Sequence, residues 1–187
     1  MTVTSTETRI PGSTAGTWTI DPVHSEVGFT VRHMMVSKVR GKFTTFGGDI
    51  VTAENPFESS VTAEIDLSSI DTGSPDRDNH IRSADFFNVD AHKVMTYRST
   101  GIRADGGDYV LDGELSLKGV TKPVSLRLEL GGFGQDPYGN TRAGFTATGE
   151  IKRSDFGVDF NAVLETGGVV VADKVNLQLE IEAVLNS

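Results

Sequence analysis

The chain has 187 residues and a mass of 20.0 kDa, and its 26 acidic and 17 basic side chains give a formal net charge of −9 and a pI near 4.8. This length favours one domain with a substantial core. The acidic balance argues against nucleic acid and against an anionic membrane surface as partners, and the lack of cysteine excludes disulfides, thiolate nucleophiles and Cys-ligated metal sites.

Residues 1–15 are rich in Thr, Ser, Gly and Pro, and we expect them to form a disordered arm. The arm has neither the basic region nor the apolar stretch of a secretory signal, and no apolar run in the chain reaches the roughly 18 residues that span a bilayer. We therefore expect a single domain over residues 16–187, without an integral membrane segment and located in the cytoplasm.

Most of the remaining chain alternates apolar and polar residues, which is typical of antiparallel strands with one dry and one wet face. In chain order, the alternating segments are 27–31, 39–43, 61–67, 109–117, 124–130, 145–151 and 175–183. Glycine-rich turns follow at 105–108, 131–140 and 166–168. About eight short strands without an internal repeat predict a sandwich or a closed up-and-down barrel.

Two stretches interrupt the alternation. One is SPDRDNHIRSADFF (74–87), which predicts a short helix near residues 75–84 with Ser74 as its cap and Pro75 at its first position. On that helix Asp78 and Arg82 are four residues apart and can pair. The other is HMMVS (33–37), where methionine can adapt to an irregular apolar surface, either as a flexible pocket wall or as a gap filler in the core.

Charged and histidine side chains are the candidates for chemistry. GxSxG is absent, and the four histidines show no HxH, HxxxH or HExxH spacing. The mixture of arginines and aspartates in 74–87 favours ion pairs with lowered carboxyl pKa values, the opposite of what a general acid needs. We expect neither catalysis nor a metal site. A metal-assisted enzyme acting on a lipid head group through His24, His33 and His80 is the alternative.

Four segments in order resemble the YceI-like family of polyisoprenoid-binding, lipocalin-like proteins: WTIDPVHSEVGFTVRHMMVSKVRGKFTTFGGDI (18–50), SSIDTGSPDRDNHIRSADFFNVD (68–90), GELSLKGVTKPVSL (113–126) and EIKRSDFGVDF (150–160). The resemblance implies an all-β fold, an extended antiparallel eight-stranded lipocalin-like barrel around an apolar tunnel. It also implies non-catalytic binding, storage or transport of a polyisoprenoid, an isoprenoid quinone or a fatty-acid-like amphiphile. No cofactor other than such a lipid is expected, and a barrel edge or mouth could pair two chains into a homodimer.

The interior of such a barrel can be filled by side chains or can hold one ligand. The inward positions mix small residues such as Gly41, Gly113 and Gly149 with large ones, which suits an interdigitated core of a structural or stress protein as well as a cavity. The resemblance favours the cavity. Its candidate lining is Phe29, Val31, Met34, Met35, Phe43, Phe46, Ile65, Phe86, Phe87, Tyr97, Leu111, Leu126, Phe145 and Ala147.

A second set of residues is expected at one end of the barrel. These side chains could lock the helix onto exposed strand ends, or an arginine among them could bind the polar head of the amphiphile, since a guanidinium matches phosphate geometry. We favour the lock. The set is His33, Arg77, Asp78, His80, Arg82 and Arg153, and Arg153 could pair with the charges of the helix.

Overall fold

A computed structural model describes residues 13–34, 36–161 and 170–186 of the chain. Its regular elements, in chain order, are β1 (Gly16–Ile20), β2 (Glu26–His33), β3 (Ser37–Phe43), β4 (Phe46–Thr52), the 3-10 turn η1 (Pro56–Glu58), β5 (Ser60–Asp66), η2 (Leu67–Ser69), β6 (Ile70–Asp71), α1 (Pro75–Arg82), β7 (Val94–Asp105), β8 (Asp108–Leu117), β9 (Val120–Gln135), β10 (Thr141–Lys152), η3 (Arg153–Phe156) and β11 (Val171–Leu185). Within the described residues no helix is both long and apolar enough to cross a membrane.

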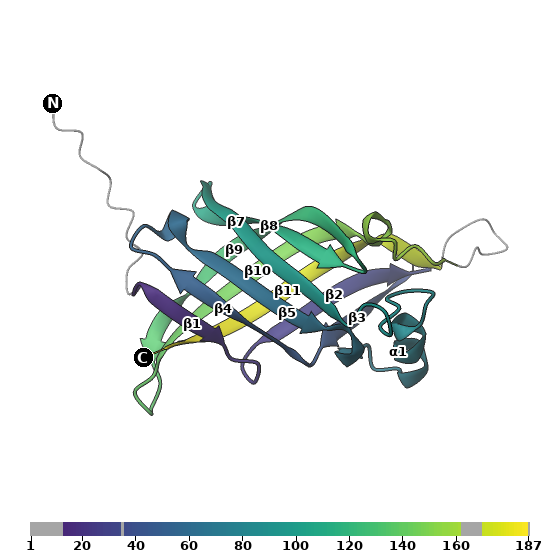
Figure 1. Ribbon diagram of the computed structural model, residues 1–187, viewed down its shortest axis with the longest axis horizontal. Helices are drawn as coiled ribbons and strands as arrows, with labels where there is room; N and C mark the ends of the chain where they lie inside the picture. The colour runs from purple at the N-terminus through teal and green to yellow at the C-terminus, as the bar shows by residue number, and fades with distance from the viewer. Residues whose placement is uncertain (1–12, 35, 162–169, 187) are drawn as a thin grey trace.

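The strands form a closed antiparallel barrel of eight members, as the sequence predicts (Figure 1). Three members are interrupted strands. β1 and β2 form one member, and both pair with β11. β3 and β4 form the second, in which β3 pairs with β2 and β4 pairs with β1. In the third, β5 continues through η2 into β6, which pairs with β3. Closure joins the two ends of the described barrel, because Trp18 of β1 is in register with Leu185 of β11.

Helix α1 lies at one end of the barrel, and the C-terminus lies at the other (Figure 1). The helix begins where the sequence predicts, since the Ser74 hydroxyl accepts a hydrogen bond from the Arg77 amide at 3.4 Å and Pro75 occupies the first position. The expected pair between Asp78 and Arg82 does not form, because each side chain has other partners at the barrel end.

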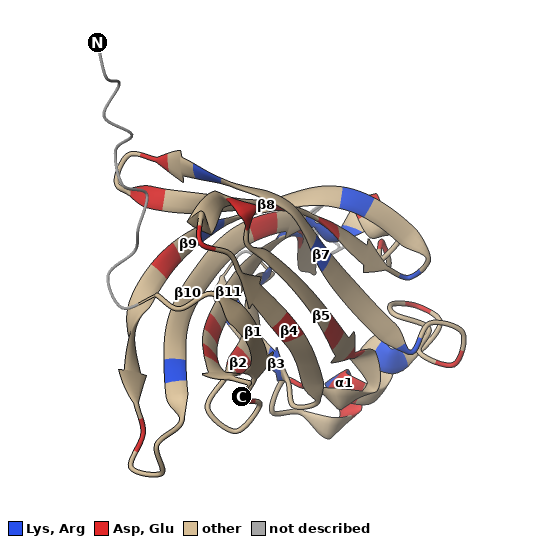
Figure 2. Cartoon of the chain, turned by 60° about the vertical axis from the view of Figure 1, so that its left-hand side comes forward, with Lys and Arg blue, Asp and Glu red and all other residues tan. Residues whose placement is uncertain are grey.

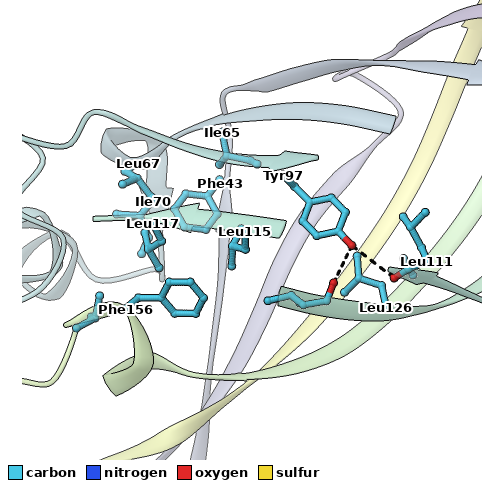
Figure 3. Packing of buried hydrophobic residues seen from close by; sticks show 13 residues of the cluster. Phe43, Ile65, Leu67, Ile70, Tyr97, Leu111, Leu115, Leu117, Leu126 and Phe156 are labelled. Atoms are coloured by element: carbon cyan, nitrogen blue, oxygen red, sulfur yellow. Dashed lines mark hydrogen bonds between the residues drawn. The ribbon is translucent and has the colours of Figure 1, made fainter. Parts of the chain in front are cut away.

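The apolar core has two parts. The larger part fills the α1 end of the barrel, where Phe43, Leu67, Ile70, Leu117 and Phe156 pack together (Figure 3). A smaller part at the opposite end has Trp18 at its centre, with Ala143 and Ala183 beside it. Between the two parts, the inward side chains of the strands leave space.

Candidate functional site

An apolar cavity of about 210 Å³ runs inside the barrel. Its wall is built mainly by alternate residues of β1 to β5 and β7 to β11, because every second side chain of a barrel strand points inward. The wall is aliphatic and aromatic along most of its length, and no charged side chain belongs to it in the part of the chain that the structure describes. Such a site suits an apolar molecule and offers no partner to a buried charge.

Most of the tunnel residues predicted from the sequence line this cavity: Phe29, Phe43, Phe46, Ile65, Tyr97, Leu111, Leu126, Phe145 and Ala147. Phe86 and Phe87 lie outside it and pack against the larger core, where the Phe87 ring lies 6.1 Å from that of Phe43. Val31 is half-buried on β2 away from the cavity, and Met34 is 43% exposed. Met35 lies outside the described residues.

The cavity wall also contains residues that the prediction omitted: Val27, Ile50, Met95, Ile102, Tyr109, Leu115, Val124, Leu128, Leu130, Phe133, Ile151, Leu177, Leu179 and Ile181. Many of them share the inward parity of the alternating segments, so extending that parity along each strand would have found them. Others belong to β4 and β7, whose alternation is too weak to read.

Hydroxyl groups gather at the end of the cavity that lies away from α1. Ser13, Thr52, Ser59 and Ser60 belong to the wall there. The Thr52 hydroxyl accepts a hydrogen bond from the Trp18 indole at 2.8 Å and donates one to the Thr14 carbonyl at 2.7 Å. Hydroxyl-bearing residues therefore border this end of a cavity whose surface is almost wholly apolar.

Two glycines in the barrel wall allow aromatic rings to lie across it. A Cβ atom at Gly113 would overlap the phenol of Tyr97, and one at Gly41 would overlap the ring of Phe29. The Tyr97 hydroxyl reaches across β8 and donates to the Val124 carbonyl of β9 at 2.9 Å (Figure 3). Burial raises the pKa of Tyr97, and the negative charge of Asp112 adds to the rise. The space beside Gly41 and Gly113 is filled by these rings, so the two glycines do not enlarge the cavity.

The polar residues of α1 contact the backbone at the barrel end. The buried Asp78 carboxylate accepts hydrogen bonds from the Thr72 amide (2.9 Å) and hydroxyl (2.6 Å). Arg77 donates to the hydroxyl and the carbonyl of the same threonine. Arg82 donates to the carbonyls of Ser68 (2.8 Å) and Ile70 (3.1 Å). Arg82 thus holds α1 against η2 and β6, and Arg77 and Asp78 hold it against Thr72, which follows β6.

Arg153 is buried at the start of η3, where its guanidinium donates to four backbone carbonyls: those of Val158, Phe160, Val171 and Ala172, at 2.8–3.1 Å. It makes no ion pair with α1, contrary to the expected pairing. Burial lowers its pKa, while Asp173 and Asp159 oppose that change. The side chain therefore ties the segment after η3 to the start of β11.

The histidines lie in separate places. The His80 Nε2 atom is 2.8 Å from the Asp85 carboxylate, and its ring meets those of Phe86 and Phe160 edge-on. His33 ends β2, in register with Ser37 and Val171. His24 lies in the loop after β1. The structure thus does not bring His24, His33 and His80 together.

Among the described residues, the only three groups within common metal-binding reach are Asp21, His24 and Glu182. Arg142 already occupies this cluster, because its guanidinium lies 2.9 Å from the Asp21 carboxylate and 3.1 Å from that of Glu182. The same guanidinium also bonds Asp136 at 2.8 Å. Together these groups form an ion-pair network that links the loop after β1 and the turn between β9 and β10 to β10 and β11.

This network predicts a specific acid sensitivity. Hydrogen bonds from His24 and Arg142 lower the pKa of Asp21 to about 2, and a hydrogen bond from Arg142 lowers that of Asp136 to about 2. Because both pKa values are depressed below the ordinary 3.8, the stabilisation is present above that pH and is lost as the pH falls through about 2.

An Arg142→Gln variant should therefore be less stable than the wild type near neutral pH, and the gap should close toward pH 2. Urea unfolding measured along this pH range tests the prediction. Arg98→Gln, which removes an exposed pair with Glu114, is the control and should show a small gap with little pH dependence. A gap for Arg142→Gln that stays constant from neutral pH to pH 2 would contradict it.

The amino-acid sequence is similar to those of known proteins. The model of the YceI-like domain matches residues 18–183. A UPF0312 protein of Pectobacterium atrosepticum is 44% identical over 136 residues, which cover 72% of this chain and 71% of that protein. Protein YceI of Escherichia coli is 43% identical over the same length and with the same coverage.

Solved structures share the fold. Burkholderia cenocepacia BcnA aligns with a TM-score of 0.76 at 24% identity, over 87% of this chain and 98% of that one. A Campylobacter jejuni YCEI protein aligns with a TM-score of 0.71 at 28% identity, over 83% and 90%. A polyisoprenoid binding domain from Saccharophagus degradans aligns with a TM-score of 0.68 at 19% identity, over 92% and 100%.

Proposed function

Because the chain belongs to the YceI-like family, we propose that it binds one long apolar amphiphile inside the barrel and stores or carries it without catalysing a reaction. The observation that carries the proposal is the continuous apolar cavity between the two parts of the core. The name of the Saccharophagus degradans relative, a polyisoprenoid binding domain, supports an isoprenoid as the ligand class. An isoprenoid quinone or a fatty-acid-like chain has the same apolar character.

Burial of the ligand's apolar tail can by itself supply the binding affinity. Each methylene group moved from water into the cavity contributes about 0.8 kcal/mol, so a long tail can bind tightly without polar contacts. The uncharged wall would repel an ionised group but accept an isoprenoid tail. In this proposal the tail lies against Leu111, Leu126 and Ala147, and the polar end lies near Ser13, Ser60 and Tyr109.

The α1 end has a different role in the proposal. The guanidinium groups of Arg77, Arg82 and Arg153 already donate to backbone carbonyls, which leaves them poorly placed to bind a lipid head group. We propose that they act with Asp78 as a lock that closes this end of the barrel. The lock would keep Phe87 packed against Phe43 and so define the inner limit of the cavity.

Gentle purification followed by native mass spectrometry tests the proposal directly. The expected result is a protein mass with a non-covalent adduct that organic extraction removes and that is identified in the extract as a long-chain lipid. A bare chain mass, together with no uptake of a fluorescent prenyl probe, would count against any binding role.

A cavity-filling substitution sharpens this test. Ala147 belongs to the cavity wall on β10, so the ring of an Ala147→Phe variant can enter the free space. We expect uptake of the prenyl probe to fall about tenfold or more, while the free energy of unfolding changes by less than the 1–3 kcal/mol typical of an overpacked core. Probe titration and urea unfolding measure the two effects.

Thr148→Phe is the matched control, because Thr148 is exposed on the outer face of the same strand. This variant should take up the probe as the wild type does. A strongly destabilised Ala147→Phe protein would instead indicate a filled barrel, in which case the chain would be a structural protein and not a carrier.

A further inference from the structure

Six basic side chains share the outer face of four neighbouring strands, β10, β11, β2 and β3. The register places Lys152 opposite Lys174 and Arg32 opposite Lys38, and Arg40 and Lys42 follow on the outer side of β3. We call this set the basic face: Arg32, Lys38, Arg40, Lys42, Lys152 and Lys174. From the sequence alone, Lys38, Arg40 and Lys42 read as a solvated strand face, because only the register shows that β2, β10 and β11 bring further cations beside them.

Only some of the described cations form ion pairs with carboxylates. Arg98, Arg103, Arg127 and Arg142 each form an ion pair with a carboxylate. In the basic face only Lys174 forms such a pair among the described residues, with Glu150 at 2.9 Å, and Asp71 of β6 lies in register with Lys42 without an ion pair between them. Acidic residues recur on β4, β5 and β8 (Figure 2), and β2 and β11 also carry Glu26 and Glu180, which lie in register with each other outside the basic face.

Like charges directly opposite each other in a sheet are destabilising. The basic face contains two such cross-strand pairs, Arg32 with Lys38 and Lys152 with Lys174. The net charge of −9 alone argues against an anionic membrane, but the register concentrates cations on one face of the barrel. This local excess of positive charge would be compensated by a negatively charged surface brought against it.

β2 and β3 form a hairpin that carries four of the six cations, and exposed aliphatic side chains lie at its tip. Met34 is 43% exposed and Val36 is 85% exposed. The turn is closed by a hydrogen bond from the Val36 amide to the His33 carbonyl at 3.1 Å, and Met34 has a positive φ of 52°. Arg32 and Lys38 follow directly on the two arms of the hairpin. The hairpin therefore combines an apolar tip with a cationic base.

We propose that the basic face and the tip formed by Met34 and Val36 dock the protein onto an anionic lipid bilayer. Aliphatic side chains that enter the interface, with Lys and Arg beside them at the level of anionic head groups, are the pattern of peripheral membrane binding. Nucleic acid fits less well, because the tip offers no aromatic ring for base stacking, whereas its exposed aliphatic side chains suit a lipid interface. The surface lies outside the cavity, so the inference does not depend on what the cavity binds.

Vesicle co-sedimentation of the full chain tests the docking surface. The probes are vesicles of phosphatidylcholine alone and vesicles of phosphatidylcholine mixed with phosphatidylglycerol. We expect binding to the mixed vesicles only, weakening as salt shortens the screening length. The double variant Lys38→Gln/Arg40→Gln should bind about tenfold more weakly or worse, and Val36→Asp should also lose binding.

The matched control is Lys93→Gln/Lys122→Gln, which changes the net charge equally at exposed cations away from the basic face. It should bind as the wild type does, and all variants should take up the prenyl probe normally. Absence of binding to the mixed vesicles at low salt would overturn the proposal. An equal loss in both double variants, or tighter binding to duplex DNA than to the vesicles, would overturn it as well.

Discussion

Replacing Arg153 with methionine should lower the free energy of unfolding by about 3 kcal/mol or more, even though no ligand contact is removed. The guanidinium donates to the carbonyls of Val158, Phe160, Val171 and Ala172, and a buried carbonyl that loses its donor costs about 1–3 kcal/mol. Water can reach some of these carbonyls in the variant, so the costs of the four lost hydrogen bonds are not expected to add in full. Urea unfolding followed by circular dichroism gives the value.

Two further variants separate the hydrogen bonds from the charge. Arg153→Lys keeps the positive charge but cannot reach four carbonyls from one ammonium, so it should recover only a small part of the loss. Lys174→Met removes a cation from an exposed pair on the adjacent strand and should change stability by less than about 1 kcal/mol. A loss below about 1 kcal/mol for Arg153→Met would show that these contacts do not hold the segment.

Replacing Gly113 with alanine should destabilise the barrel by about 1–3 kcal/mol, although alanine normally improves on glycine in a strand. The new Cβ would overlap the Tyr97 phenol, so the ring must leave the wall and its hydroxyl must give up the Val124 carbonyl. The displaced ring would then enter the cavity, and uptake of the prenyl probe should fall with stability.

Gly101→Ala is the matched control on the neighbouring strand, since no atom lies within 4 Å of a Cβ built there. It should leave both stability and uptake close to the wild type. Tyr97→Leu in the Gly113→Ala background should recover part of the loss, because a double-mutant cycle detects residues that share one space. Strictly additive losses would contradict the close approach of Gly113 and Tyr97.

The sequence contains enough information for the barrel and for most of its wall. Strict alternation over long segments such as 109–117 and 175–183 identifies both the strands and their inward faces. β7 is harder to find, because a register shift between Ser99 and Gly101 moves the inward parity from Tyr97 to Ile102. β1 and β4 are short and contain few apolar residues.

The contacts at the barrel end could not be read from the sequence. Charged residues four apart on a helix suggest a pair, but the nearby strand ends offer backbone groups that need partners. Asp78 therefore bonds Thr72, and Arg82 bonds Ser68 and Ile70. The positions of Phe86 and Phe87 also depend on the tertiary fold. The segment after α1 turns both rings toward the core at the α1 end of the barrel and away from the cavity.

Closure of the barrel by β1 and β11 affects the order in which it can fold. Trp18 and Leu185 are separated by most of the described chain, so their pairing is a long-range contact that forms only once β1 and β11 are both available. Until then β10 lacks the long partner that β11 provides, and its free edge can pair with another nascent chain. The order in which β11 joins β10 and β1 therefore decides whether the folding chain exposes an edge that can aggregate.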